Sequence, residues 1–532
     1  MSTETATPAV KPEAPARNWS GLGWGFIVKL LLMMMVNAVG LSIILSAWGA
    51  EAWVILAASA ALLVAANWVY FARRTLPLKY IFPGLVFLLI FQVFVMGYTA
   101  YVATTNYGAG HNVDKGQAID AALINAERRV EDSPTYPLTV VRDGDTLGFA
   151  VTSASGAVQV GTEDAPLAAV DGATADASGK PTEVPGWEVV SLNELLSDQE
   201  LAQQVTSLRV PVSDEADDGS LRTREGSTAS IYRSSLIWDE EADALVDTDT
   251  GVTYTADEYG TFTGDDGSTL PVGYRVGVGL ENFVKAVTDP DLAGPLLKVA
   301  AWTFAFAFLT VATSFLLGLF FALVFNDDRI RGKKTLRTLF ILPYAFPAFL
   351  TALLWRGMLN AEFGVINEWF FFGADINWLG DPWLAKFSIL FVNLWLSYPY
   401  WFLVCTGALQ SLPTETTEAA KIDGAGKWRM FRSITFPLLL VSTAPLAIAS
   451  FAFNFNNFTI IYMLTNGGPR FTDTSVPLGS TDILITAIYQ ISGVAGGRAD
   501  YGLASALSIV VFVVVGIVSA IAFRQTKKLE EY

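Results

Sequence analysis

The sequence has very little cysteine and histidine. Among its 532 residues there is one cysteine, Cys405, and one histidine, His111. A single cysteine excludes a disulfide framework and a cysteine-based zinc site. A single histidine excludes a histidine-cluster metal centre and a Ser–His catalytic pair built within this chain. We therefore expect neither a catalytic residue nor a metal site.

Charge is also scarce. Charged residues make up 16% of the chain and hydrophobic residues 52%, and the mean hydropathy is +0.42. A soluble protein of this length carries far more charge, so the composition predicts an all-α polytopic membrane protein. The formal net charge of −17 argues against nucleic acid as a partner.

A nucleotide-binding loop is missing as well. Gly424-Ala-Gly-Lys427 is similar to the end of a phosphate loop. That motif requires a glycine where this chain has Lys421, and Ser or Thr where it has Trp428. The chain therefore does not bind ATP by this device.

Long apolar runs define the domain organisation. Runs of about 20 residues or more, enough to cross a hydrocarbon core of about 30 Å, recur along the chain. We expect about eight transmembrane helices, near residues 24–47, 52–72, 80–103, 296–325, 335–358, 384–411, 437–463 and 502–524. The first run is too long, and lacks a small-residue cleavage site, to be a removed signal peptide. The expected domains are a disordered tail (residues 1–20), three N-terminal helices (21–103), a soluble insert (104–278) and a core with five helices (279–532).

Lysine and arginine gather on one side of the predicted spans, and these residues favour the cytoplasm. Both termini are therefore expected in the cytoplasm, and residues 104–278 outside it. The basic residues that give this orientation are Arg73, Arg74, Lys79, Arg329, Arg331, Lys333, Lys334, Arg337, Lys421, Lys427, Arg429, Arg432, Arg524, Lys527 and Lys528.

The insert is acidic and long enough to bury its own core. Alternating apolar residues at 138–141 and 146–151, around Arg142-Asp-Gly-Asp145, predict a β-hairpin. Residues 191–205 favour a short helix, and residues 231–261 favour further strands. We expect a β-rich α+β domain outside the cytoplasm. Its acidity suits either solubility alone or a docking surface for a partner protein.

The sixth and seventh spans each carry a polar and aromatic face at helical spacing. The two sets are Asn393, Ser397 and Tyr400, at i, i+4 and i+7, and Ser450, Phe453, Asn454 and Asn457, at i, i+3, i+4 and i+7. Amides and hydroxyls between aromatic rings suit an uncharged ligand rich in hydroxyls, such as a sugar. The same groups also suit hydrogen bonding between packed helices. Neither face carries an acidic residue, which argues against a proton- or sodium-coupled carrier.

Prolines interrupt two of the spans. Pro343 and Pro347 in the fifth span and Pro399 in the sixth remove backbone hydrogen bonds and should kink their helices. Such kinks suit hinges around a central cavity, although membrane helices often contain proline without that role.

A charged stretch separates the sixth span from the seventh. Thr414 is placed to cap a short helix, and Asp423-Gly-Ala-Gly426 should end it, because glycine reverses the chain at low steric cost. A second amphipathic piece at residues 427–435 follows, and Pro437 opens the next span. A helix, an elbow and a second helix between two spans indicate a docking element.

Several motifs resemble those of ABC importer permeases that work with binding proteins. Glu418-Ala-Ala420, Gly424 and Ile434-Thr-Phe-Pro437 are similar to the "EAA" loop of that family, which here covers residues 412–437. Further motifs, together with eight spans and a large insert after the third, resemble the MalF-type subunits of maltose/maltodextrin importers. These motifs are Asn393–Tyr400, Ala449–Phe458 and Asn466-Gly-Gly-Pro469.

The resemblance implies a set of partners. They are a second, MalG-like permease, a dimeric MalK-like cytoplasmic ATPase, a sugar-binding protein outside the cytoplasm, and the lipid bilayer. The ATPase would bind ATP and Mg, so this chain would need no cofactor and would not itself be an enzyme. The helix of the EAA loop would lie in a cleft of the ATPase. The coupling residues implied are Glu418, Ala419, Ala420, Asp423, Gly424 and Pro437.

The resemblance further implies that the sugar site consists of the seven residues on the two polar faces. Ser397 stands where the maltose subunit has glycine, which narrows the site and adds a hydrogen-bond donor. We expect a permease subunit for maltose/maltodextrin-like oligosaccharides in the bacterial inner membrane. The alternatives are a permease for another di- or oligosaccharide such as a trehalose-like one, and an ion-coupled secondary carrier. A membrane-embedded enzyme would need paired acidic residues such as Asp375 and Asp381.

Overall fold

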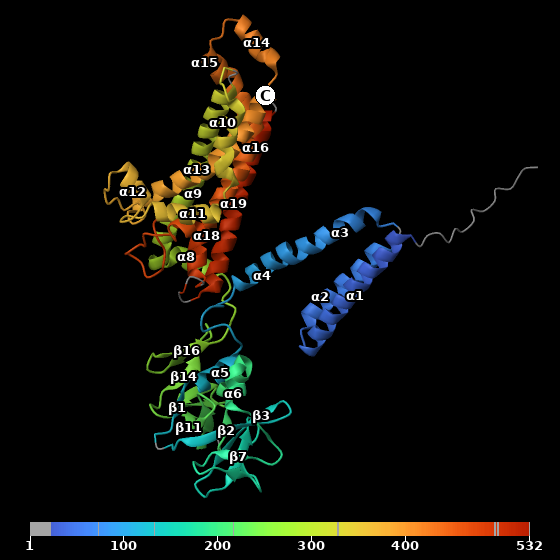
Figure 1. Cartoon of the computed structure of the whole chain (residues 1–532), viewed down its shortest axis with the longest axis vertical. Helices are drawn as coiled ribbons and strands as arrows, with labels where there is room; N and C mark the ends of the chain where they lie inside the picture. The colour runs from blue at the N-terminus through green and yellow to red at the C-terminus, as the bar shows by residue number, and fades with distance from the viewer. Residues whose placement is uncertain are drawn as a thin grey trace, which may run out of the picture. The chain divides into compact units, whose positions relative to one another are not determined.

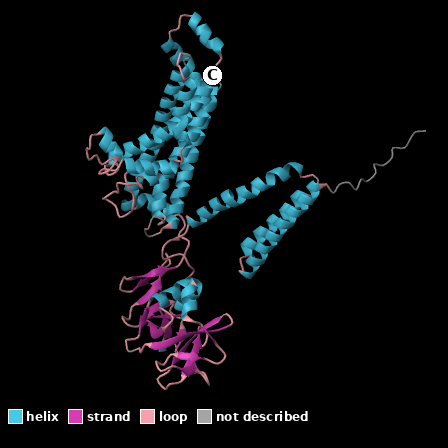
Figure 2. Cartoon of the chain, viewed as in Figure 1, coloured by secondary structure: helices cyan, strands magenta, loops and turns pink. Residues whose placement is uncertain are grey.

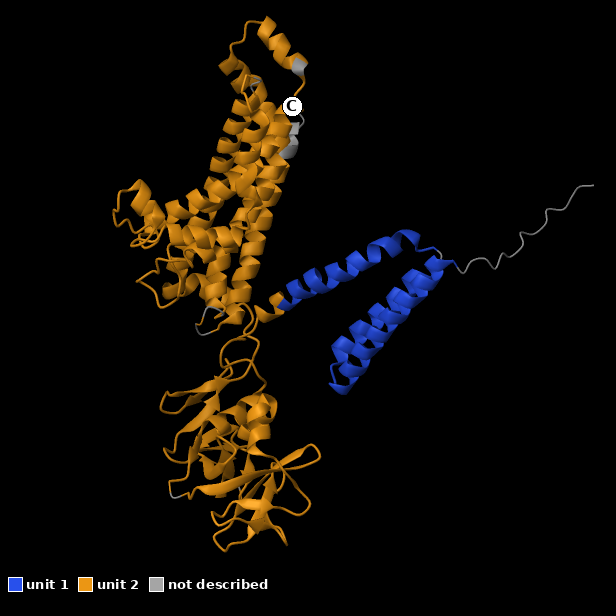
Figure 3. Ribbon diagram, viewed as in Figure 1, with its two compact units in different colours: residues 1–98 blue, residues 99–532 orange. Residues whose placement is uncertain are grey.

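The computed structural model describes residues 23–72, 74–131, 133–215, 218–326, 329–493, 496 and 499–530, with backbone only for residue 414 and residues 525–530. The expected tail at residues 1–20 and the basic residue Arg73 lie outside the described residues. The chain forms two compact units, residues 1–98 and 99–532 (Figure 3), and each is described by itself.

The first unit consists of apolar helices. They are α1 (Trp24–Gly49), α2 (Trp53–Phe71), α3 (Leu76–Leu88) and a π-helical stretch η1 (Leu89–Phe94), which continues into α4 (Val95–Val102). The boundary between the two units falls within α4. Two amides join α1 to α2: Asn67 donates to Oδ1 of Asn37 over 2.7 Å, and Asn37 donates to Oδ1 of Asn67 over 3.2 Å. This reciprocal pair is a polar contact between helices of the kind that membrane proteins use for packing.

The insert is a β-rich domain (Figure 2), and its described residues include three α-helices. A nine-stranded sheet has the order β5-β4-β3-β2-β11-β10-β9, with β1 paired to β11 and β8 to β2; a second sheet runs β12 to β16, and β6 pairs with β7. The strands are β1 (Glu127–Arg129), β2 (Tyr136–Asp143), β3 (Thr146–Thr152), β4 (Val158–Thr162), β5 (Ala168–Ala169), β6 (Thr174–Ala175), β7 (Pro181–Glu183), β8 (Glu188–Val189), β9 (Val210–Pro211), β10 (Ser220–Thr223), β11 (Thr228–Ser234), β12 (Leu236–Asp239), β13 (Ala244–Asp247), β14 (Thr253–Ala256), β15 (Thr261–Gly264) and β16 (Thr269–Gly273).

The predicted hairpin is present in this domain. Strands β2 and β3 pair from Asp143 opposite Thr146 onward, and Gly144 in the turn has a φ of 59°. The helix predicted at residues 191–205 is two helices, α6 (Leu192–Ser197) and α7 (Gln199–Ser207). They are separate because Asp198 leaves the helical conformation and caps α7, its side chain accepting the N–H groups of Glu200 and Leu201. The third helix, α5 (Lys115–Asn125), packs against β12 and β16.

The second unit also contains the helical core. Its helices are α8 (Glu281–Thr288), α9 (Pro290–Asn326), α10 (Lys333–Ile341), the 3-10 turn η3 (Leu342–Ala345), α11 (Ala348–Met358), α12 (Val365–Phe370), α13 (Pro382–Gln410), α14 (Thr414–Ile422), α15 (Lys427–Met430), the π-helical η4 (Phe431–Thr435), α16 (Phe436–Phe455), α17 (Phe458–Leu464), α18 (Leu484–Ile491) and α19 (Tyr501–Glu530).

Among the described residues, seven helices are long and apolar enough to cross a membrane. An eighth span is possible because α10 with η3 and α11 form a pair that bends by 91°. The predicted fold class, about eight apolar helices with a β-rich insert, is confirmed. The fifth span breaks at Phe346 and Pro347, where a kink was predicted. By contrast, α13 is one helix through Pro399.

Helix α9 lies at the centre of the core and packs along α13. The two backbones come close at Gly318, where an added Cβ would lie 2.6 Å from the backbone nitrogen of Phe402. Around this contact Phe315, Phe325 and Trp401 are buried. A residue larger than glycine would therefore push α9 and α13 apart.

Candidate functional site

Three helices of the core meet at a cluster of buried polar side chains. Asn393 of α13 donates to Oδ1 of Asn454 on α16 over 2.9 Å. The same amide nitrogen lies 3.3 Å from the hydroxyl of Thr310 on α9. Both asparagines are 3% exposed. The two faces predicted from helical spacing therefore meet directly through their amides.

Two serines extend this cluster. The hydroxyl of Ser397, one turn after Asn393, lies 3.5 Å from Oδ1 of Asn393. The side-chain amide nitrogen of Asn454 donates a hydrogen bond to the backbone carbonyl of Ser450 over 2.8 Å. Because the amides satisfy one another, the cluster holds α9, α13 and α16 together in this conformation.

Tyr400 belongs to an aromatic group beside the cluster. Its ring stacks on Tyr344 of η3 with centroids 6.5 Å apart, and it contacts the ring of Trp401 at 5.4 Å. Trp401 is fully buried, and its indole N–H has no hydrogen-bond partner among the described residues. These rings offer flat apolar faces, and the tyrosines add a polar hydroxyl.

The remaining two predicted residues lie apart from the amides. Phe453 points outward and is 71% exposed. Helix α16 ends at Phe455, so the expectation that Asn457 shares its face is wrong. Asn457 instead caps α17, its side chain accepting the N–H of Ile460 over 3.4 Å. Asparagine side chains compete with helical backbone bonds, which favours a break at Asn456 and Asn457 over a continuous helix.

Sequence reasoning missed two residues of this site. Thr310 was detectable, because Thr303, Thr310 and Ser314 recur at helical spacing in the fourth span and all three are buried. Tyr344 gave no comparable signal. It approaches Tyr400 because the fifth span breaks beside it.

The predicted docking element lies at the end of the core opposite the insert (Figure 1). Helix α14 ends in a glycine-centred motif: Ala425 donates to the carbonyl of Ala420 over 2.9 Å, and Gly424 donates to that of Lys421 over 3.1 Å. Gly424 has a φ of 78°, a value at which glycine avoids a steric penalty. The predicted elbow is therefore present. The expected cap is wrong, because the helix already begins at Thr414, after Pro413.

Beyond the elbow the chain does not form a separate second helix. Helix α15 runs through η4 into α16, so residues 427–455 form one span. Pro437 has no N–H to donate to the preceding turn, which fits the wide π-helical turn just before it. On α14, Glu418 and Ala419 are exposed, as is Asp423 at its end, whereas Ala420 is buried. Ile422 on α14 and Trp428 on α15 are also strongly exposed, so this end of the core presents apolar side chains as well as charged ones.

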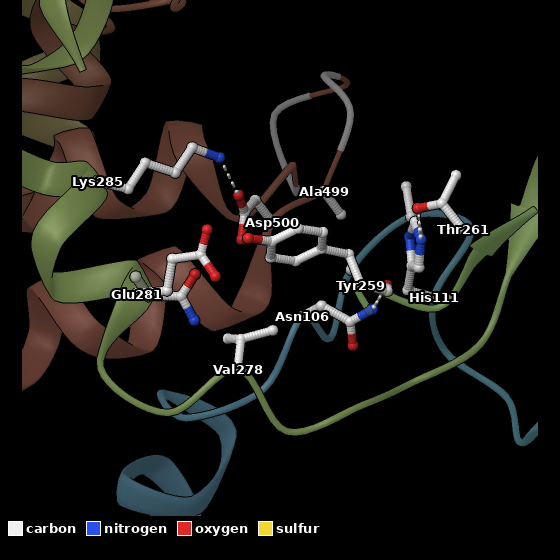
Figure 4. A pocket seen from close by; sticks show the side chains of 12 residues that line it. Asn106, His111, Tyr259, Thr261, Val278, Glu281, Lys285, Ala499 and Asp500 are labelled. Carbon is white, nitrogen blue, oxygen red and sulfur yellow. Dashed lines mark hydrogen bonds and ion pairs between the residues drawn. The ribbon is translucent and has the colours of Figure 1, made fainter. Parts of the chain in front are cut away.

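A cavity of about 430 Å³ lies where the insert joins the core (Figure 4). Lys285 of α8 forms an ion pair with Asp500 at 3.4 Å, and the ring of His111 lies 3.1 Å from the hydroxyl of Thr261. A hydrogen bond to Glu281 raises the pKa of Tyr259. Most of the polar groups drawn there form ion pairs or hydrogen bonds with one another. The cavity is therefore part of the connection between the insert and the core.

Backbone bonds reinforce this connection. Ala109 donates to Ala499 over 2.7 Å, and Gly502 donates to Tyr107 over 2.9 Å. Gly502, in the first turn of α19, lies so close to the carbonyl of Thr105 that an added Cβ would overlap with it. The base of the insert is therefore fixed to α19.

The buried side chain of Asp482 lies in the turn between α17 and α18. Oδ2 of Asp482 accepts the N–H of Gly479 over 2.8 Å and lies 3.5 Å from the guanidinium of Arg470. Burial raises the pKa of Asp482 to about 6, although hydrogen bonds from Thr486 and Gly479 and the charge of Arg470 act in the opposite direction. Asp381, one of the two acidic residues considered for an enzyme, caps α13 by accepting the N–H groups of Trp383 and Leu384.

Family models match two parts of the chain. Residues 296–529 match the binding-protein-dependent transport system inner membrane component. Residues 86–164 match the N-terminal part of the transmembrane subunit in binding-protein-dependent ABC transporters. Together they cover the helical core and the beginning of the insert.

Curated relatives match most of the chain. The maltose/maltodextrin transport system permease protein MalF of Vibrio vulnificus is 33% identical over 479 residues, which is 87% of each chain. The chain belongs to the MalF family. MalF of Salmonella typhimurium is 32% identical over 96% of each chain, and MalF of Escherichia coli is 31% identical over 97% of each. The predicted resemblance is confirmed.

Membership in the MalF family makes the chain a multi-pass inner-membrane component of a binding-protein-dependent ABC transport system. The chain is also similar to a subunit of a bacterial ABC transporter involved in the import of the acidic polysaccharide alginate. That crystal structure is 23% identical, covers 47% of this chain and 84% of its own, and gives a TM-score of 0.41.

Proposed function

We propose that this MalF-family chain is the permease subunit through which maltose/maltodextrin-like oligosaccharides enter the cytoplasm in an ATP-driven importer. The MalF relatives, which are named for maltose and maltodextrin, support this substrate class. The observation that carries the mechanism is the direct connection of α13 and α16 by the α14 element. The helices whose amides meet at Asn393 and Asn454 are therefore the two that a partner at α14 moves.

The proposed partners are a second, MalG-like permease, a dimeric cytoplasmic ATPase similar to MalK, and a sugar-binding protein on the side of the insert. ATP and Mg are bound by the ATPase. Glu418, Ala419 and the exposed Ile422 supply a charged and apolar surface on α14 for its cleft. The basic residues near α14 and both termini lie in the cytoplasm in this proposal, with the insert outside.

In the proposed cycle, closure of the ATPase pulls α14 inward. The core then shifts from a state open to the cytoplasm to a state open to the outside. Separation of α13 from α16 breaks the bond between Asn393 and Asn454 and exposes both amides to sugar hydroxyls. The rings of Tyr400 and Tyr344 then pack on the sugar. Hydrolysis of ATP resets the core.

The test is uptake of radiolabelled maltotriose by cells of the native host in which this gene is deleted and then restored. Uptake should disappear in the deletion strain and return with the wild-type gene. Radiolabelled trehalose serves as the competing substrate. If the deletion abolished trehalose uptake and left maltotriose uptake unchanged, the substrate would be a trehalose-like sugar and the proposed substrate class would be wrong.

A further inference from the structure

The loop between the fifth span and α13 carries several exposed aromatic side chains. Phe372 is 96% exposed, Trp383 is 77% exposed and Trp369 is 74% exposed. Phe370 and Phe387 are exposed as well. We call Trp369, Phe370, Phe372, Trp383 and Phe387 the α12 patch. No acidic or basic residue lies within the run from Trp369 to Gly373, so water solvates this surface poorly.

The backbone of this loop is fixed in the shape that exposes the rings. Asn367 of α12 is 3% exposed and donates to the carbonyls of Ala361 and Ile376, both over 3.0 Å. Its Oδ1 accepts the indole N–H of Trp378 over 2.7 Å. Its carbonyl accepts the N–H of Gly373 over 2.9 Å. The loop is therefore tied at one buried amide, and the aromatic side chains do not turn inward.

The backbone conformation of Phe372 directs its ring outward. Its φ of 55° is in the left-handed region, which is uncommon for a residue with a bulky side chain. Phe371, directly before it, packs on Trp378 with ring centroids 5.2 Å apart. The left-handed conformation thus separates two adjacent rings, one packed against the protein and one directed away from it.

The position of α13 gives the depth of the α12 patch. The 29 residues of α13 begin at Pro382. At about 1.5 Å per residue they extend about 43 Å, close to the thickness of a bilayer with its headgroups. If α13 crosses the bilayer along its whole length, its first turn, with Trp383, reaches the headgroup layer. Helix α12 is connected to this turn by a short loop and projects sideways from the helices of the core (Figure 1).

The chemistry of the α12 patch fits this layer. Tryptophan and other aromatic rings favour the boundary between headgroups and acyl chains. Trp383 and Phe387 continue the patch onto the exposed side of α13, a helix long and apolar enough to cross a membrane. The flanking carboxylates of Glu368, Asp375 and Asp381 keep the loop out of the hydrocarbon centre.

We propose that α12 and its aromatic patch bind the lipid headgroup layer on the insert's side of the membrane. This contact anchors the loop that joins the broken fifth span to α13. It thereby fixes the depth of the first turn of α13 in the membrane. The proposal depends only on the chain's membrane location, and it can fail without affecting the proposed sugar transport.

Photo-crosslinking in the intact cell tests this contact. The full chain, with an affinity tag, carries p-benzoylphenylalanine in place of Phe372 or, in a second variant, of Trp369. Cells are grown with ³²P-phosphate, which labels phospholipids, and are irradiated. The chain is then purified under denaturing conditions and examined for label that alkaline methanolysis releases, as it does from ester lipids. Leu196, 77% exposed on α6 of the insert, is the matched aqueous position.

For the variants at positions 372 and 369, we expect ³²P that methanolysis releases from a chain whose gel mobility is unchanged. Its level should be at least fivefold above that of the variant at position 196. A band of higher mass that carries protein instead of lipid would show that the α12 patch is a subunit or binding-protein contact, and would overturn the proposal. Label no higher than at position 196 in both variants would place the patch in water and would also overturn it.

Discussion

Asn393 and Asn454, 61 residues apart in sequence, share a hydrogen bond of 2.9 Å in the middle of the helical core. The bond joins α13 to α16, and the segment between these helices carries α14. In the proposed function, a movement of α14 acts on both partners of the bond.

Replacement of Asn454 by alanine should weaken sugar transport. It leaves the buried amide of Asn393 without its partner, and it removes a group that would bind sugar hydroxyls. A lost buried hydrogen bond costs about 1–3 kcal/mol, so we expect a rise of roughly tenfold in the apparent KM for maltotriose uptake. ATP hydrolysis by the assembled transporter should remain coupled.

The pair of Asn37 and Asn67 in the first unit provides the matched control. Asn67→Ala also breaks an amide pair between helices, but it is far from the α13 and α16 faces in sequence. It should lower thermal stability without changing the apparent KM. An equal effect of both variants on KM would mean that Asn454 acts only in helix packing.

Replacement of Glu418 by alanine should abolish uptake while the chain still inserts into the membrane. Glu418 is exposed on α14, so its loss leaves no buried group unpaired. Uptake measured beside the amount of chain in membrane fractions separates the two effects. Glu415→Ala, at another exposed position on the same helix, is the control and should keep most of the activity. Normal uptake by the Glu418 variant would refute the docking role of this residue.

Two substitutions of different severity at Gly424, in the elbow after α14, test the same docking element. Gly424 has a φ of 78°, and valine there costs at least about 1–2 kcal/mol in the left-handed conformation. Gly424→Val should therefore lose uptake. Gly424→Asn should keep most of it, because asparagine tolerates this conformation. Equal uptake by both variants would show that the shape of the elbow does not matter.

The turn held by Asp482 should show a defined pH dependence. The folded pKa of about 6 lies above the ordinary value of 3.8, so the folded protein binds the proton more tightly. Stability from this group is therefore fully present below pH 3.8 and is lost as the pH rises through 6. The shift corresponds to about 3 kcal/mol.

Thermal denaturation of the purified chain and of Asp482→Asn, compared at pH 5 and at pH 7.5, measures this contribution. The difference in midpoint, wild type minus variant, should be larger at pH 5. An asparagine cannot titrate, but it keeps an oxygen for the N–H of Gly479. A difference that does not change with pH would contradict the assigned cause.

The base of the insert has its own test at Gly502. Alanine there overlaps with the carbonyl of Thr105 and should loosen the contact between residues 104–109 and α19. Limited proteolysis should then release the insert several-fold faster. Gly516, on the same helix, has open space around it, so Gly516→Ala should behave as wild type. Unchanged proteolysis of Gly502→Ala would show that the contact does not hold the insert.

Sequence patterns predicted those features that depend on local chemistry. The elbow at Gly424, the hairpin at Asp143 and Thr146, and the break near Pro347 follow from glycine, alternation and proline respectively. The helical period also placed Asn393 and Asn454 on faces that meet. Asn457 shows the limit, because the period continues through a point where two adjacent asparagines end the helix. The contact of Tyr344 with Tyr400 depends on a 91° bend, which the presence of proline does not specify.

The central claim is that this chain conducts sugar only when a separate ATPase drives it. The direct measurement is uptake of radiolabelled maltotriose into proteoliposomes that contain the purified chain, either alone or assembled with the permease, ATPase and binding protein of its own host. We predict no uptake by the chain alone, ATP-dependent uptake by the assembly, and loss of that uptake with Glu418→Ala. Uptake by the chain alone, or uptake by the assembly without ATP, would contradict the account.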